Sequence, residues 1–159
     1  MARWDEVLDA APELAREALA LLDAHRHKTL ATLRPDGSPR ISGIETVIHG
    51  GDVYLGMIWG SGKARDLQRD PRFALHTGST DPPDWAGDAT VSGRAVEETD
   101  PDRVLQVLGE PGKDRPEGPA HMFRLDIDEV TVVRLGNPPD HIVVTSWRPG
   151  RGIRRVERR

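Results

Sequence analysis

Residues 53–67 read VYLGMIWGSGKARDL, an apolar run that leads directly into a polar segment. The run from Val53 to Ile58 predicts a strand. Ser61 is a favourable helix N-cap, and Pro71 would end a helix about two turns later. The stretch therefore predicts a strand that delivers Lys63 to the first turn of a short helix.

Such a turn suits a phosphate group. The first backbone N–H groups of a helix have no partner within it, the helix dipole is positive at that end, and Lys63 adds an ammonium. The simpler interpretation is a capped surface turn whose lysine is solvated. The glycine spacing of a Walker loop is absent, so these residues alone leave both interpretations open.

The flanking sequence predicts a single domain over residues 1–159 that is mainly β. An amphipathic pattern predicts an N-terminal helix from Pro12 to about His25, and Asp100 and Pro101 open a short helix. The other segments alternate apolar and polar residues or are rich in β-branched residues, which predicts strands. Gly50-Gly51 marks a hairpin. The expected strands are 29–33, 40–49, 52–58, 72–77, 89–97, 121–135 and 141–147. Six or seven strands joined mostly by hairpins indicate an antiparallel barrel.

Composition narrows the possible functions. The chain has no cysteine, which excludes disulfides and thiolate zinc sites, and its six histidines show no metal-ligand spacing. A net charge of -4 argues against a nucleic-acid partner. No window resembles a membrane span and the first residues lack the apolar core of a signal peptide, so we expect a cytoplasmic protein. Six arginines in residues 148–159 predict a frayed, solvated tail, or a surface for an anionic ligand tail or a partner.

The order of these segments resembles a known family. TLATLRPDGSPR at residues 29–40, then a hairpin, then SGKARDL at 61–67 and RDPRFAL at 69–75 resemble the pyridoxamine 5'-phosphate oxidase-like split-barrel family. That family includes FMN enzymes and the reductases that use the deazaflavin coenzyme F420. The resemblance implies a split antiparallel β-barrel with an N-terminal helix, and a homodimer that holds its cofactor at the subunit interface.

The resemblance also implies a set of cofactor-binding residues. Ser61 and Lys63 match the positions that meet the phosphate, and Arg40 matches the strand arginine at the same phosphate. Met57 and Ile58 match the stretch whose backbone lies against the flavin ring. Fixed cations and a helix start would neutralise a phosphate dianion, which agrees with this assignment.

Two positions depart from the vitamin B6 oxidases. Gly62 lies in the cofactor-binding turn where those enzymes carry arginine, and Glu45 replaces a strand lysine. Trp59 adjoins the turn and is a further candidate for the cofactor site, although packing explains it as simply. Loss of two cations argues against true pyridoxamine 5'-phosphate oxidase activity.

We therefore expect an FMN-dependent or F420-dependent oxidoreductase that acts on a small organic molecule. No protein acid, base or nucleophile stands out, which fits hydride transfer because the cofactor supplies that chemistry. The alternative is a flavin-binding or small-ligand-binding protein without catalytic activity on the same barrel. Haem is a third possible ligand, although no histidine is an evident axial ligand.

Overall fold

The computed structural model describes all 159 residues. Strands account for 45% of them and helices for 23%, which confirms the prediction of a mainly β protein. The four helices are α1 (Trp4–Ala10), α2 (Pro12–Ala24), α3 (Gly62–Arg69) and α4 (Pro101–Leu108). The nine strands are β1 (Lys28–Leu33), β2 (Pro39–Ile44), β3 (Thr46–His49), β4 (Asp52–Ile58), β5 (Arg72–His76), β6 (Asp88–Glu98), β7 (Ala120–Leu135), β8 (Ile142–Arg148) and β9 (Gly152–Arg158).

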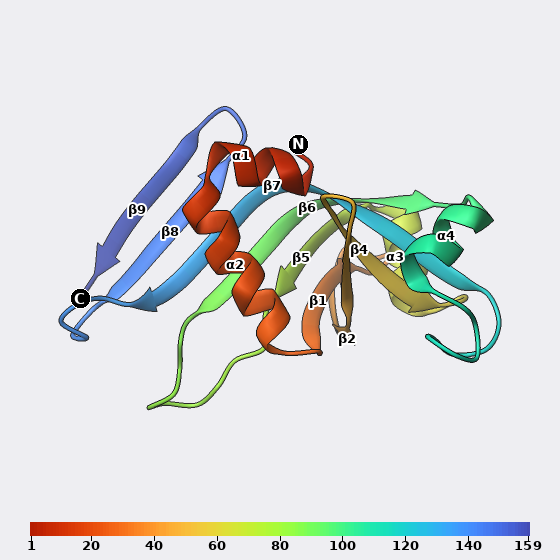
Figure 1. The fold of residues 1–159 in the computed structure, drawn as a ribbon, viewed down its shortest axis with the longest axis horizontal. Helices are drawn as coiled ribbons and strands as arrows, with labels where there is room; N and C mark the ends of the chain where they lie inside the picture. The colour runs from red at the N-terminus through yellow and green to blue at the C-terminus, as the bar shows by residue number, and fades with distance from the viewer.

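The sheet divides along β7, its longest strand (Figure 1). β6 pairs with one edge of β7, whereas the other edge is shared by β4 at residues 120–124 and β8 at residues 130–135. All pairs are antiparallel, and the strand order is β2-β1-β5-β6-β7-β4-β3, with β8 and β9 branching from β7. The sheet is not closed, which agrees with the expected split barrel.

A bulge bends the long β6–β7 ladder. The register shifts between Ser92 and Gly93. A Cβ atom at Gly93 would overlap the backbone oxygen of Asp126, so only glycine allows the two strands to approach this closely. The bulge increases local twist, which lets β7 curve from the β4 side of the molecule to the β8 side.

Helices α1 and α2 close the core on one face of the sheet (Figure 1). The buried stripe of α2 consists of Leu14, Ala15, Ala18 and Leu22, and it contacts β6, β7 and β8. This stripe follows the helical spacing from which the sequence predicts an amphipathic helix. None of the four helices is both long and apolar enough to cross a membrane.

The predicted strand over residues 40–49 is wrong, because the structure divides it at Glu45. β2 pairs with β1, whereas β3 pairs with β4. The side chain of Ile44 turns into the core, and the carboxylate of Glu45 turns outward to Arg26 and His27. The chain therefore changes partner strand at this residue, and this break contributes one strand beyond the predicted six or seven.

The prediction of a frayed C-terminal tail is also wrong. Residues 152–158 form β9, which pairs in register with β8. The backbone N–H of Arg151 donates to the carbonyl of Arg148 at 3.1 Å, and Gly150 has φ +71°. Pro149-Gly150 thus occupies the centre of a tight turn, in the order that favours a type II turn. β9 is therefore the second strand that the sequence did not predict, after the one that results from the division at Glu45.

Candidate functional site

The candidate site is built where β4 ends and α3 begins. The backbone N–H of Ser61 donates to the carbonyl of Ile58 at 3.2 Å, and the N–H of Arg65 donates to the carbonyl of Ser61 at 3.1 Å. Gly60 between them has φ +72°, a backbone conformation that glycine adopts without strain. We refer to residues 59–64 as the α3 turn.

The α3 turn contains donors without acceptors. The backbone N–H groups of Gly62, Lys63 and Ala64 donate to no backbone or side-chain oxygen. The hydroxyl of Ser61 is buried and also forms no hydrogen bond, although Ser61 is the N-cap residue. Buried polar groups are normally hydrogen-bonded, so this arrangement is suited to an anionic ligand that accepts from several donors.

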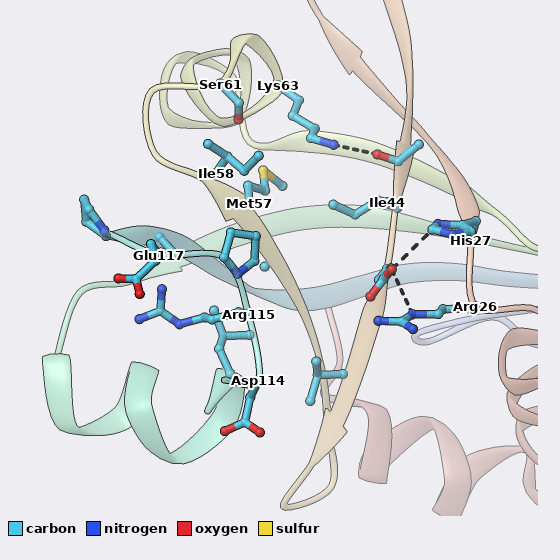
Figure 2. Close-up of a pocket in the computed structure, with 18 residues that line it drawn as sticks. Arg26, His27, Ile44, Met57, Ile58, Ser61, Lys63, Asp114, Arg115 and Glu117 are labelled. Carbon is cyan, nitrogen blue, oxygen red and sulfur yellow. Dashed lines mark hydrogen bonds and ion pairs between the residues drawn. The ribbon is translucent and has the colours of Figure 1, made fainter. Parts of the chain in front are cut away.

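A pocket of about 570 Å³ opens beside this turn (Figure 2). The lining residues from the β2–β3 segment, β4 and the α3 turn are Gly43, Ile44, Glu45, Val47, Gly56, Met57, Ile58, Ser61 and Lys63. The other lining residues are Arg26, His27, Leu108, Asp114, Arg115, Pro116, Glu117, Pro119 and Ala120. The volume lies within the usual range of about 300–1,000 Å³ for small-molecule sites.

One wall of the pocket is an unpaired strand edge. β3 pairs with β4 only as far as Leu55, so residues 56–58 lack a partner on that edge. Gly56, Met57 and Ile58 all line the pocket, and Ile58 is 70% exposed. The backbone groups that point to this unpaired edge can pair with the polar edge of a planar ligand, while the side chains provide an apolar surface.

Lys63 supplies a cation at the same end of the pocket. Its Nζ donates to the carbonyl of Gly43 on β2 at 2.5 Å, which is the dashed line from Lys63 in Figure 2. Partial burial lowers the pKa of Lys63. A carbonyl satisfies one ammonium hydrogen but leaves the charge unpaired, and an anion beside Lys63 would stabilise that charge.

A buried carboxylate beneath the turn organises two further cations. Asp66 on α3 accepts hydrogen bonds from Thr32 Oγ1 at 2.8 Å, Arg40 Nε at 2.7 Å and Arg69 Nη2 at 3.1 Å. Burial acts to raise the pKa of Asp66, but these three donors outweigh it and lower the pKa. Two guanidinium groups share one carboxylate, so the cluster keeps a positive charge close to the α3 turn.

Gly62 lets one of these cations reach the helix start. A Cβ atom at Gly62 would lie 3.1 Å from Cζ of Arg40, which is tighter than ordinary contact. The guanidinium of Arg40 therefore lies directly against the first residue of α3. Its Nε binds Asp66, whereas its two Nη atoms form no hydrogen bond within the protein.

The structure gathers most of the predicted site residues at one place. Met57, Ile58, Ser61 and Lys63 line the pocket. Gly62 and Arg40 lie beside the same helix start but do not line the pocket itself. Trp59 lies outside this pocket, where its ring stacks on His121 with centroids 4.1 Å apart.

The sequence interpretation missed the opposite wall, which the loop between α4 and β7 provides. Arg115 is held in this loop by two carbonyls, because its Nε donates to Gly109 at 3.2 Å and its Nη1 to Gly118 at 2.8 Å. Asp114 and Glu117 line the pocket from the same loop. The several charges between Gly109 and Pro119 were the available signal, but nothing local places that loop over β4.

The sequence of the chain also identifies its family. The family model for pyridoxamine 5'-phosphate oxidase matches residues 14–134. The chain therefore belongs to the pyridoxamine 5'-phosphate oxidase family, which confirms the resemblance seen in the sequence. No curated protein sequence matches it.

Solved structures share the fold at low sequence identity. Protein Rv2991 from Mycobacterium tuberculosis is 22% identical with a TM-score of 0.63, over 74% of this chain and 82% of that protein. PhzG from Burkholderia lata 383, solved with tetrahydrophenazine-1-carboxylic acid, is 16% identical with a TM-score of 0.64, over 93% and 92%. A heme binding protein from Mycobacterium smegmatis is 15% identical with a TM-score of 0.60, over 91% and 87%. These likenesses support the fold, and their ligands differ.

Substitution of Asp66 tests the cation cluster. Asp66→Asn leaves Arg40 and Arg69 without their carboxylate, and we expect the free energy of unfolding at pH 7 to fall by about 3 kcal/mol. Because the folded-state pKa of Asp66 is lowered, its stabilisation is present above the ordinary carboxyl pKa near 4 and is lost as pH falls through the lower folded value. Denaturant unfolding from pH 7 to pH 3 should therefore show the wild-type advantage shrinking in acid.

The matched control is Asp9→Asn. Asp9 is exposed on α1 and forms no ion pair or side-chain hydrogen bond, so its stability should not change. An Asp66→Asn protein as stable as wild type at pH 7 would contradict the role assigned to the cluster.

Proposed function

We propose that this protein is an oxidoreductase that binds FMN in the pocket beside α3 and acts on a small organic molecule. Membership of the pyridoxamine 5'-phosphate oxidase family supports a flavin-type redox function in general terms. The observation that carries the specific proposal is the α3 turn. It offers three unpaired backbone N–H groups, a buried serine hydroxyl without a partner, and Lys63.

The residues present fit a flavin mononucleotide. The phosphate would accept hydrogen bonds from the α3 turn, with Lys63 beside it and Arg40 behind Gly62. The ring would lie along the free edge of residues 56–58. Bound FMN supplies the two-electron redox chemistry, while the protein orients the ring and excludes water.

The opposite wall would select the substrate. Arg115 and Glu117 line the pocket from the loop between α4 and β7, on the side opposite β4 (Figure 2). The hydrogen bonds from Arg115 to two carbonyls hold its side chain in one conformation. A side chain that is already ordered binds a polar substrate group at a lower entropic cost. Glu45 adds a carboxylate on the strand side, where Arg26 Nε binds it at 3.0 Å.

Charge distribution favours FMN over the deazaflavin coenzyme F420. F420 extends beyond its phosphate into an acidic tail, which requires a basic path leading away from the turn. Most of the C-terminal arginines lie on or beside β9, and β9 branches from the sheet at the end remote from α3 and α4 (Figure 1). Within one subunit these arginines do not extend the phosphate end of the pocket.

We further propose that the protein is a homodimer with the cofactor at the interface. Helices α1 and α2 cover only one face of the sheet. Ile41 on β2 is 72% exposed and Ile58 beside the pocket is 70% exposed. A second subunit that covered these side chains would bury apolar surface and limit access of water to the cofactor.

Replacement of Lys63 tests the phosphate site. We expect Lys63→Ala to raise the Kd for FMN about tenfold, since a charge-assisted hydrogen bond contributes about 1.5–3 kcal/mol. Fluorescence titration of FMN into the apo-protein measures this Kd. Affinity should also fall at alkaline pH, because the lowered pKa of Lys63 brings its loss of charge to lower pH.

Lys113→Ala is the control, since Lys113 is exposed and lies outside the pocket lining. It should leave the Kd unchanged. Absence of FMN binding by the wild-type protein, together with saturable binding of haemin, would replace the flavin proposal with a haem function. Equal FMN affinity in the wild-type and Lys63→Ala proteins would show that Lys63 does not bind the phosphate of FMN.

Sedimentation velocity tests the homodimer. Wild-type protein at low micromolar concentration should sediment at twice the chain mass of 17.6 kDa. Ile41→Glu should weaken the dimer at least tenfold because it would bury an unpaired carboxylate. Ile153→Glu on exposed β9 should not affect the dimer. A wild-type monomer that binds FMN would refute the interface proposal.

A further inference from the structure

A buried histidine connects the α3 turn to the sheet. His121 lies near the start of β7, and its side chain is 4% exposed. Its Nε2 receives a hydrogen bond from the backbone N–H of Gly60 at 3.1 Å. Its Nδ1 lies 2.6 Å from Oε1 of Glu97 on β6. The imidazole therefore bridges the end of β6 and the residue before the N-cap of α3.

These contacts determine the protonation state of the ring. A backbone N–H only donates, so Nε2 must carry a lone pair. A carboxylate only accepts, so Nδ1 must carry the hydrogen. His121 is consequently the neutral Nδ1–H tautomer. An imidazolium would direct a second N–H at the Gly60 N–H and lose that hydrogen bond.

The same carboxylate also binds the far end of α3. Nε2 of Gln68 donates to the two oxygens of Glu97 at 3.1 and 2.9 Å. Gln68 belongs to the last turn of α3, whereas Gly60 precedes its first turn. Glu97 thus holds both ends of the helix, directly through Gln68 and through His121 to Gly60.

Trp59 completes the arrangement. Its ring lies parallel to the imidazole, with an interplanar angle of 5°. The stacked indole covers one face of His121 and restricts the ring to the orientation that both hydrogen bonds require. Trp59 does not line the pocket beside α3, and this stacking on His121 gives its side chain a structural role.

We infer that His121 and Glu97 are positioning residues for the α3 turn, acting on cofactor affinity through the Gly60 N–H. The inference rests on the proposed function in one respect, that the ligand held by the turn is FMN. The left-handed conformation of Gly60 sets the direction in which the chain enters Ser61. Loss of the hydrogen bond from the Gly60 N–H to His121 would therefore let the following N–H donors of the α3 turn move out of position. Neither side chain lines the pocket beside α3, and both act through the backbone of the turn.

Two substitutions of His121 separate its two hydrogen bonds. His121→Gln can place an amide oxygen near the position of Nε2 and accept from Gly60. His121→Asn can place an amide N–H near the position of Nδ1 and donate to Glu97, but leaves Gly60 without an acceptor. We expect His121→Asn to raise the Kd for FMN about tenfold, and His121→Gln to stay within about threefold of wild type.

Val130→Ala is the control for simple loss of stability. Val130 is fully buried on the same strand, but it pairs with Trp147 of β8 and lies away from the β4 end that carries the α3 turn. It should lower Tm without changing the Kd for FMN. Unchanged affinity in His121→Asn, or equal losses in the Asn and Gln variants, would overturn the assignment.

The wild-type protein provides a readout that requires neither FMN nor a variant. ¹⁵N chemical shifts of the His121 ring should give a protonated Nδ1 and an unprotonated Nε2, and the Gly60 amide should exchange slowly with solvent. The opposite tautomer, or a rapidly exchanging Gly60 amide, would overturn the inference even if FMN binds. Failure of wild-type protein to bind FMN, with the tautomer and the protection as expected, would count against the proposed cofactor and leave the positioning role of the two residues supported.

Discussion

The start of α3 leaves backbone donors unsatisfied, and the surrounding structure holds them in that state. A free helix start is ordinarily capped by a side chain or solvated. Here the hydroxyl of Ser61 does not cap the helix, and Asp66 fixes α3 from beneath by binding Arg40 and Thr32. The donors are thereby pre-organised, which reduces the free-energy cost of ordering them when an anion binds.

The division of β7 explains why a pocket exists beside that turn. Since β4 and β8 share one edge of β7, β4 runs away from the main body of the sheet and carries α3 with it. β3 covers only the first part of β4, so residues 56–58 keep a free edge. The loop before β7 then closes the space from the other side. Fold and site therefore have a common origin in the strand pairing.

The sequence predicted those parts of the molecule whose causes are local. Apolar spacing identified α2, and the strand-to-helix stretch located Ser61 and Lys63 in the pocket that the structure forms. The β9 hairpin was missed because the charge of its arginines outweighed the Pro149-Gly150 turn signal. The role of Glu97 with His121 depends on pairing between distant strands, and Arg115 reaches the pocket through a loop. Neither arrangement leaves a local pattern in the sequence.

The unpaired N–H groups at the start of α3 are the groups that would receive the phosphate of the ligand. The amide ¹H–¹⁵N spectrum of the protein, titrated with FMN, reports on each of them separately. We expect the largest downfield amide proton shifts at Gly62, Lys63 and Ala64, because new hydrogen bonds to a phosphate shift amide protons in that direction. Saturable FMN binding that leaves these three amides unshifted would contradict this role of the α3 turn.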